Sequence, residues 1–179
     1  MILSAHLIAI GGFAGAGKST LARRLGRELS IPVFEIDQIA KSIQLSESFR
    51  GTPQDAYGIS FDLFFDFAKT HLGNNGNLIF DQNLGHARTW QNIEQLRSKL
   101  EGKAKIKIFI LDCPWELCLE RFAVRTEHPN IDDVTLHDLA NHKWKWDYLN
   151  ENKLPQAIRI DATQTQDEVF RSVNKHLFC

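Results

Sequence analysis

Short, nearly continuous apolar runs alternate along the chain with longer stretches in which apolar residues recur every three or four positions. The short runs are typical of buried strands and the longer periodicity of amphipathic helices. Strands that are apolar on both faces need helices on both sides of a parallel sheet. The alternation therefore predicts an α/β fold in a single domain, residues 1–179. The predicted strands are residues 6–10, 33–36, 77–80, 105–111 and 157–160.

The ends of the helical stretches carry recognisable residues. Gly73 and Gly102 stand where two helices are expected to stop, since glycine often follows the last helical residue. Pro114 suits the first position of a helix that begins after a strand. Thr165 and Glu168 have the spacing of a capping box and are expected to open the final helix. The other predicted helices span residues 19–29, 61–72, 90–100 and, with weaker periodicity, 127–150.

The loop after the first strand carries the most specific pattern in the chain. It reads Gly12-Phe13-Ala14-Gly15-Ala16-Gly17-Lys18-Ser19-Thr20 and fits G-x-x-x-x-G-K-S/T at every fixed position. Its glycines let backbone N–H groups approach phosphate oxygens, and the following helix directs its positive end at the same anion. Lys18 adds a charge for the terminal phosphate, and the Ser19 hydroxyl is a ligand for Mg²⁺. We therefore predict that these nine residues bind ATP and that Ser19 binds Mg²⁺.

A dinucleotide-binding alternative fits the same glycines less well. Gly11, Gly15 and Gly17 match the G-x-x-x-G-x-G of short-chain dehydrogenases, and Asp37 lies at the distance of a ribose-binding acid. Members of that family carry a Tyr-x-x-x-Lys pair at the active site. Neither Tyr57 nor Tyr148 is followed by lysine at that spacing. Lys18 and Ser19 would also have no role, so the phosphate-binding interpretation is preferred.

Acidic residues stand where three of the predicted strands end. Because the P-loop lies at the same edge of the sheet, these carboxylates are candidates for the chemistry of phosphoryl transfer. We predict that Asp37 orients or deprotonates an acceptor hydroxyl and that Asp81 belongs to the metal shell. Asp112 precedes Cys113 and Pro114, and we predict that it caps the helix that follows.

Arg121 and Arg125 are four residues apart and would share one helical face. We predict that they neutralise charge on the transferring phosphate and are catalytic with Lys18 and Asp37. Two roles are open for Asn83, His86 and Arg88, which line an acceptor pocket or lie in a surface loop. Trp144 and Trp146 stack on a planar ligand or, more often for such residues, pack against the core.

Composition adds few constraints. The net charge is −1, with 21 basic and 22 acidic residues, which gives no support to a nucleic-acid or membrane partner. The three cysteines are odd in number and without metal-ligand spacing, which favours a reducing compartment. The apolar start lacks the basic residues of a signal peptide, so we expect a cytoplasmic protein.

The motifs together resemble the small P-loop kinases. That group includes nucleoside monophosphate, shikimate and gluconate kinases, polynucleotide kinase, chloramphenicol phosphotransferase and zeta toxins. The resemblance follows the P-loop, Asp37, Ile79-Phe80-Asp81-Gln82-Asn83, Leu111-Asp112-Cys113-Pro114 and Arg121-Phe122-Ala123-Val124-Arg125. It implies a three-layer sandwich with a five-stranded parallel sheet in order 2-3-1-4-5, lid arginines, and a short lid around residues 125–135. Residues 34–40 also resemble dephospho-coenzyme A kinase, a likeness that the later segments do not support.

Three function classes follow from these observations, and the last, a kinase of nucleic-acid ends, needs a basic channel that the near-neutral composition does not support. The first is a kinase that moves the γ-phosphoryl group of Mg-ATP to a hydroxyl or phosphate of a small-molecule acceptor. The second is a regulatory ATPase or switch without such an acceptor. A GTPase would carry an Asn-Lys-x-Asp motif at its guanine site. The segments that begin at Asn152 and Asn174 do not have Asp at the fourth position. An oligomeric motor would need a further helical domain, for which the chain has little room.

Overall fold

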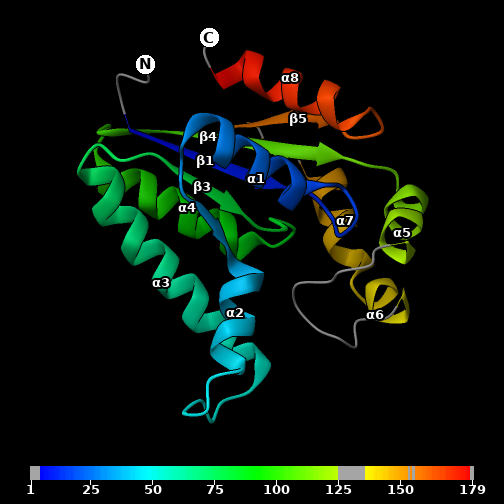
Figure 1. The fold of residues 1–179 in the computed structure, drawn as a ribbon, viewed down its shortest axis with the longest axis horizontal. Helices are drawn as coiled ribbons and strands as arrows, with labels where there is room; N and C mark the ends of the chain where they lie inside the picture. Colours follow the sequence, from blue (N-terminus) through cyan, green and yellow to red (C-terminus); the bar gives the residue numbers. More distant parts are fainter. Residues whose placement is uncertain (1–4, 125–135, 153, 155, 178–179) are drawn as a thin grey trace.

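The computed structural model describes residues 5–124, 136–152, 154 and 156–177. Its centre is a sheet of five parallel strands in the order β2-β3-β1-β4-β5, as predicted. Figure 1 shows the sheet at the centre, with helices on either side of it. The strands are β1 (Ala5–Gly11), β2 (Val33–Glu35), β3 (Leu78–Asp81), β4 (Ala104–Asp112) and β5 (Ala157–Asp161).

Two apolar cores lie on the two faces of the sheet. Successive side chains of β1 alternate between them: Leu7 and Ala9 belong to one core, and Ile8 and Ile10 to the other. Helices α1, α5 and α8 cover the second face, whereas α3 and α4 cover the first. The helices are α1 (Lys18–Leu29), α2 (Ile36–Gln44), α3 (Pro53–Gly73), α4 (Ala87–Leu100), α5 (Trp115–Ala123), α6 (Leu136–Asn141), α7 (Lys143–Glu151) and α8 (Gln166–Leu177).

Both ends of α3 differ from the prediction, the first of them because a capping box was not recognised. Helix α3 begins at Pro53, eight residues before the predicted stripe, and Thr52 and Asp55 close a reciprocal capping box at its start. The Asp55 amide donates to the Thr52 hydroxyl over 3.2 Å, and the Thr52 amide donates to Asp55 over 2.7 Å. Gly73 is the last residue of α3, and Asn74 is its C-cap.

The strand register brings the predicted acids to one edge. Asp81 is the last residue of β3 and lies opposite Glu35 of β2 and Ile10 of β1. The P-loop follows directly from β1, and the amide of Gly12 donates to the Asn83 carbonyl over 3.0 Å. The carboxyl ends of the central strands therefore hold the phosphate-binding motif and Asp81 side by side.

A search for membrane spans among the described helices found none that combines the length and apolar character required to cross a bilayer.

Candidate functional site

The P-loop has the conformation that its glycines allow. Gly15 and Gly17 have φ angles of 87° and 94°, a region that disfavours side chains. A Cβ on Gly15 would lie 2.2 Å from the carbonyl oxygen of Cys118, so the loop approaches α5 closely. Gly17 is the N-cap of α1, whose first turn has neither a side-chain cap nor an acidic residue. The positive end of α1 is therefore available to an anion.

Lys18 begins α1, and its ammonium turns back toward the loop. Its Nζ donates to the carbonyl oxygen of Phe13 over 3.1 Å, across the curl of the P-loop. No carboxylate of the described residues lies within 4.0 Å of this ammonium in the ion pairs of the structure. The charge of Lys18 therefore remains directed at the space that the loop encloses.

Ser19 and Asp81 meet beside the P-loop. The Ser19 hydroxyl is hydrogen-bonded to the Asp81 carboxylate, which is only 6% exposed. Burial raises the pKa of Asp81 to about 6, Lys18 and Ser19 oppose this rise, and the charges of Asp37 and Glu35 add to it. A buried carboxylate next to a hydroxyl matches the oxygen ligands that Mg²⁺ prefers, so these two residues fit a magnesium site.

This buried carboxylate predicts a stability gain on neutralisation. The folded-state pKa of Asp81 is raised from 3.8 to about 6, so the unfolded chain holds fewer protons between these values and stability falls as pH rises through them. We expect Asp81→Asn to increase the free energy of unfolding of the metal-free protein by up to about 3 kcal/mol at pH 8, and by about half as much at pH 5. Urea denaturation in EDTA at both pH values measures this.

A control of opposite sign is available on β5. Hydrogen bonds from the Thr163 hydroxyl and amide lower the pKa of Asp161, so Asp161→Asn is expected to lower stability at pH 8. An Asp81→Asn variant that is no more stable than the wild type at pH 8 would contradict the description of Asp81 as a carboxylate held against its solvation.

The prediction that Asp37 closes the second strand is wrong. Strand β2 ends at Glu35, and Asp37 lies in the first turn of α2, where the helix dipole favours its negative charge. The reason is that Ile36 and Ala40 are both buried along one face of a helix that begins immediately after the strand. The strand-ending acid is Glu35, which is paired with Arg23 by two hydrogen bonds of 2.8 and 2.9 Å.

Asp37 nevertheless faces the same region as Asp81. The charge of Asp37 adds to the burial that raises the pKa of Asp81. The Tyr57 hydroxyl of α3 is hydrogen-bonded to the Asp37 carboxylate, and burial together with this carboxylate raises the pKa of Tyr57. Asp37 is half-buried and does not form an ion pair within the described part of the chain. The structure thus holds Asp37 in place with a neutral donor and leaves its charge available.

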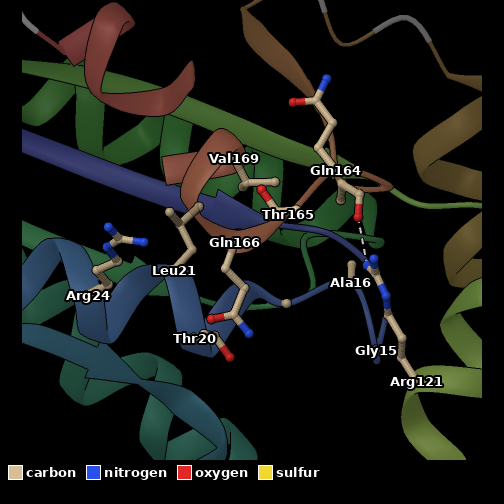
Figure 2. Close-up of a pocket in the computed structure, with 12 residues that line it drawn as sticks. Gly15, Ala16, Thr20, Leu21, Arg24, Arg121, Gln164, Thr165, Gln166 and Val169 are labelled. Atoms are coloured by element: carbon tan, nitrogen blue, oxygen red, sulfur yellow. Dashed lines mark hydrogen bonds between the residues drawn. The ribbon is translucent and has the colours of Figure 1, made fainter. Parts of the chain in front are cut away.

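A pocket of about 370 Å³ opens between the P-loop and the segment that joins β5 to α8 (Figure 2). Arg121 of α5 forms one wall and donates to the Ala162 carbonyl oxygen over 2.6 Å. The volume falls within the range of small-ligand sites. The remaining lining residues are Gly15, Ala16, Gly17, Thr20, Leu21, Arg24, Gln164, Thr165, Gln166 and Val169.

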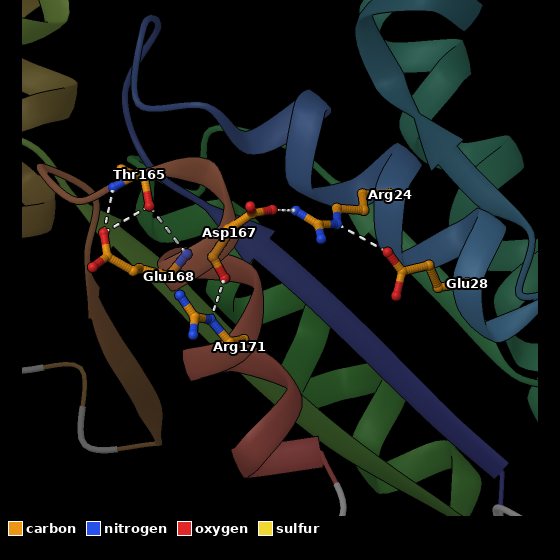
Figure 3. Close-up of polar contacts among 6 residues, drawn as sticks. All are labelled: Arg24, Glu28, Thr165, Asp167, Glu168 and Arg171. Carbon is orange, nitrogen blue, oxygen red and sulfur yellow. Dashed lines mark hydrogen bonds and ion pairs between the residues drawn. The ribbon is translucent and has the colours of Figure 1, made fainter.

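The wall on the α8 side is held to α1 by an ion pair (Figure 3). Arg24 binds Glu28 of its own helix over 2.9 Å and Asp167 of α8 over 2.5 Å. The predicted capping box is confirmed, because Thr165 and Glu168 bind each other's backbone amides over 3.0 and 3.4 Å. The pocket is therefore bordered by a rigid helix start and not by a loose turn.

The prediction that Asp112 caps the next helix is wrong. Asp112 ends β4 and takes two hydrogen bonds from Arg159 of the adjacent strand, one of them over 2.7 Å. Neighbouring parallel strands place these side chains on the same face, where a guanidinium can bind a carboxylate through two N–H groups. Helix α5 begins at Trp115 and has no side-chain cap. Pro114 is its N-cap and not its first helical residue, so the helix starts one residue later than predicted.

The other candidate residues have structural contacts. The Asn83 side chain accepts from the Gly85 amide over 2.8 Å, and His86 caps α4 by accepting from the Arg88 amide over 3.0 Å. Trp146 donates to the Cys113 carbonyl over 2.9 Å and packs against Trp115, as expected of a core residue. Trp144 is 46% exposed and contacts the ring of His86. Arg125 lies outside the described residues, as does the predicted lid at 125–135.

Several residues of the site were not predicted from the sequence. Tyr57 and Lys145 approach Asp37 from α3 and α7, and no motif or periodicity marks either of them. The pocket wall at residues 162–166 was identified only as the start of a helix. Glu35 was also missed as the strand-ending acid, because Ile36 continues the apolar run beyond it.

Comparison with solved structures supports the fold. A putative kinase of Chloroflexus aurantiacus is 18% identical with a TM-score of 0.72, covering 97% of this chain and 98% of that one. A gluconokinase of Sinorhizobium meliloti is 17% identical with a TM-score of 0.61, covering 98% and 95%. The tunicamycin resistance protein of Deinococcus radiodurans is 20% identical with a TM-score of 0.63, covering 97% and 95%. At these identities the likeness establishes the architecture alone.

Comparison of the sequence with known families assigns it more directly. A search of the curated proteins found no match. Residues 7–145 match the family model described as an AAA domain, a segment that contains the P-loop, Asp37, Asp81 and Arg121. With this match over most of its length and with its P-loop sheet, the chain belongs to the AAA domain family of P-loop proteins.

Proposed function

We propose that the protein is a kinase that transfers the γ-phosphoryl group of ATP to a hydroxyl or phosphate of a small-molecule acceptor. The observation that carries the proposal is the position of Asp37, a half-buried carboxylate held by Tyr57 within electrostatic reach of the Asp81–Ser19 pair and the P-loop. A carboxylate in this position suits the activation of a nucleophile beside the phosphates, which we assign to an acceptor hydroxyl. The kinases among the proteins of similar fold are in keeping with this proposal.

The nucleotide would occupy two connected regions. Its phosphates would lie in the P-loop at the N-terminus of α1, where backbone amides and Lys18 offer positive charge. Its base and ribose would enter the pocket of about 370 Å³ beside Thr20 and Gln166, whose walls are apolar at Leu21 and Val169. Arg121 lines the same pocket and would approach a phosphate from there.

Ser19 and Asp81 would hold Mg²⁺ together with phosphate oxygens of the nucleotide. Among the described residues, no cluster of three His, Cys, Asp or Glu side chains exists that could bind a metal ion without the nucleotide. When bound, the ion would neutralise charge on the phosphates.

Asp37 would bind the acceptor. Its carboxylate accepts from Tyr57 and has further lone pairs for an acceptor hydroxyl, which it would orient toward the P-loop and relieve of its proton. Lys18 and Arg121, with Arg125, would balance the charge that develops on the transferred group.

Cys113 and Cys118 are free thiols in this structure, in keeping with a cytoplasmic location.

The experiment is to measure ATP consumption by the purified protein with Mg²⁺, alone and with nucleosides, sugars, coenzyme precursors and small hydroxy acids. Turnover that requires one acceptor and yields its phosphorylated form supports the proposal. Hydrolysis at a rate that no compound changes would replace it with a regulatory ATPase.

A further inference from the structure

Lys145 is fixed next to the loop that follows Asp81. A Cβ on Gly85 would lie 2.6 Å from the backbone oxygen of Lys145 and 2.8 Å from its Cβ, so α7 packs directly on the β3–α4 loop. Trp144, the preceding residue, contacts His86 of the same loop with ring centroids 5.8 Å apart. These contacts place the Lys145 side chain at the edge of the sheet where the acids gather.

Lys145 is half-buried, and its charge interacts with that of Asp37. Burial lowers the pKa of Lys145, and the charge of Asp37 partly opposes this effect. Within the described residues, no carboxylate lies within 4.0 Å of this ammonium, whose closest described aromatic partner is the ring of Trp144 at 5.4 Å. Lys145 thus loses part of its hydration without gaining an ion pair, and an anion from outside would stabilise it.

Lys143, two residues earlier on the same helix, differs in this respect. Its ammonium is exposed and forms an ion pair with Asp147, four residues further along α7. It therefore has its counter-ion within the helix, as an ordinary surface lysine does. The contrast shows that α7 offers one lysine to solvent and another to the region of Asp37.

We propose that Lys145 binds an anionic group of the acceptor, so that the acceptor is a hydroxylated compound carrying a carboxylate or a phosphate at a distance from its reacting hydroxyl. This inference rests on the proposed kinase function. Asp37 binds the hydroxyl of the acceptor, and Lys145 binds its anionic group. An acceptor that satisfies both charges has a hydrogen-bond donor at one end and an anion at the other. Asp37 repels a small anion that arrives in the wrong orientation, which gives the pair a preference for one direction of binding.

The acceptor panel tests the inference when it is arranged as matched pairs. Each pair contains a polyol or sugar and its counterpart with a carboxylate or a phosphate at the far end, assayed with saturating Mg-ATP. We expect the wild type to phosphorylate an anionic member at least tenfold more efficiently than its neutral counterpart, since a charge-assisted contact has about this effect or more. The carboxylate and phosphate arms then identify which anion is preferred.

Three variants distinguish Lys145 from a merely structural residue. Lys145→Met keeps an alkyl chain beside Gly85 of the β3–α4 loop, and we expect it to raise KM for the anionic acceptor on the order of 10- to 100-fold with little change in kcat. Lys145→Arg should retain much of the wild-type KM. Lys143→Met is the control and should match the wild type. Thermal unfolding with and without ATP verifies that each variant folds and binds nucleotide.

The outcomes separate the two proposals. Acceptor-dependent turnover with equal use of neutral and anionic compounds, or an unchanged KM in Lys145→Met, would overturn the role of Lys145 and leave the kinase function standing. A parallel rise in KM for neutral and anionic acceptors would also overturn it, because it would indicate a structural effect. Absence of acceptor-dependent turnover throughout the panel would overturn both.

Discussion

Asp37→Asn is expected to lower phosphoryl transfer by about 10²-fold or more while leaving ATP binding nearly intact. The amide has the shape of the carboxylate and can still accept from Tyr57, but it cannot take a proton from an acceptor hydroxyl. ATP affinity should change little, because Asp37 lies on α2 and not in the P-loop. Single-turnover transfer and ATP titration, measured on the same preparation, separate the two effects.

A matched control for this variant is Asp62→Asn, which neutralises an exposed acid on α3 without approaching the site. It should behave as the wild type in both assays. A rate of transfer by Asp37→Asn within a few-fold of the wild-type rate would remove Asp37 from the mechanism. Asp81, beside Ser19, would then be the functional acid.

Lys18→Ala is expected to abolish measurable turnover, with a loss of about 10²- to 10³-fold or more, and to leave the fold intact. The ammonium would bring a full positive charge to the phosphates, and in the structure it donates to the Phe13 carbonyl. Alanine is a good helix former at the start of α1, so the melting temperature without ATP should remain close to that of the wild type.

The informative comparison for Lys18→Ala is the shift in melting temperature that ATP produces. The wild type should be stabilised by ATP and the variant much less. Lys69→Ala, an exposed lysine on α3, serves as the control for loss of one positive charge. Retention of more than a tenth of the wild-type kcat/KM in Lys18→Ala would contradict the assignment of the phosphate site.

The sheet and its order could be predicted because the relevant signals are local. The P-loop fixes a strand, a loop and a helix in sequence, and the apolar runs identify the other strands. Helix α2 was missed because Ile36 continues the apolar run of β2 and also begins a helical face. Both patterns share that residue, so the sequence alone could not place Asp37 on one side of the boundary.

The site could be predicted only where a motif marks it. Ser19 and Asp81 meet as expected, since one belongs to the P-loop and the other ends the adjacent strand. The partner of Asp112 was predicted wrongly because the cross-strand contact with Arg159 depends on residues 47 positions apart. Lys145 likewise reaches the site only through the packing of α7 on Gly85, which no local pattern encodes.

In the proposed reaction the γ-phosphoryl group of ATP passes to an acceptor held by Asp37 and not to water. The most direct measurement uses ATP labelled in its γ-phosphate, with an acceptor that raises turnover, and follows the label into phosphorylated acceptor and inorganic phosphate. We expect most of the label to enter the acceptor and Asp37→Asn to remove this product. Label recovered in inorganic phosphate alone, at a rate independent of every acceptor, would contradict it.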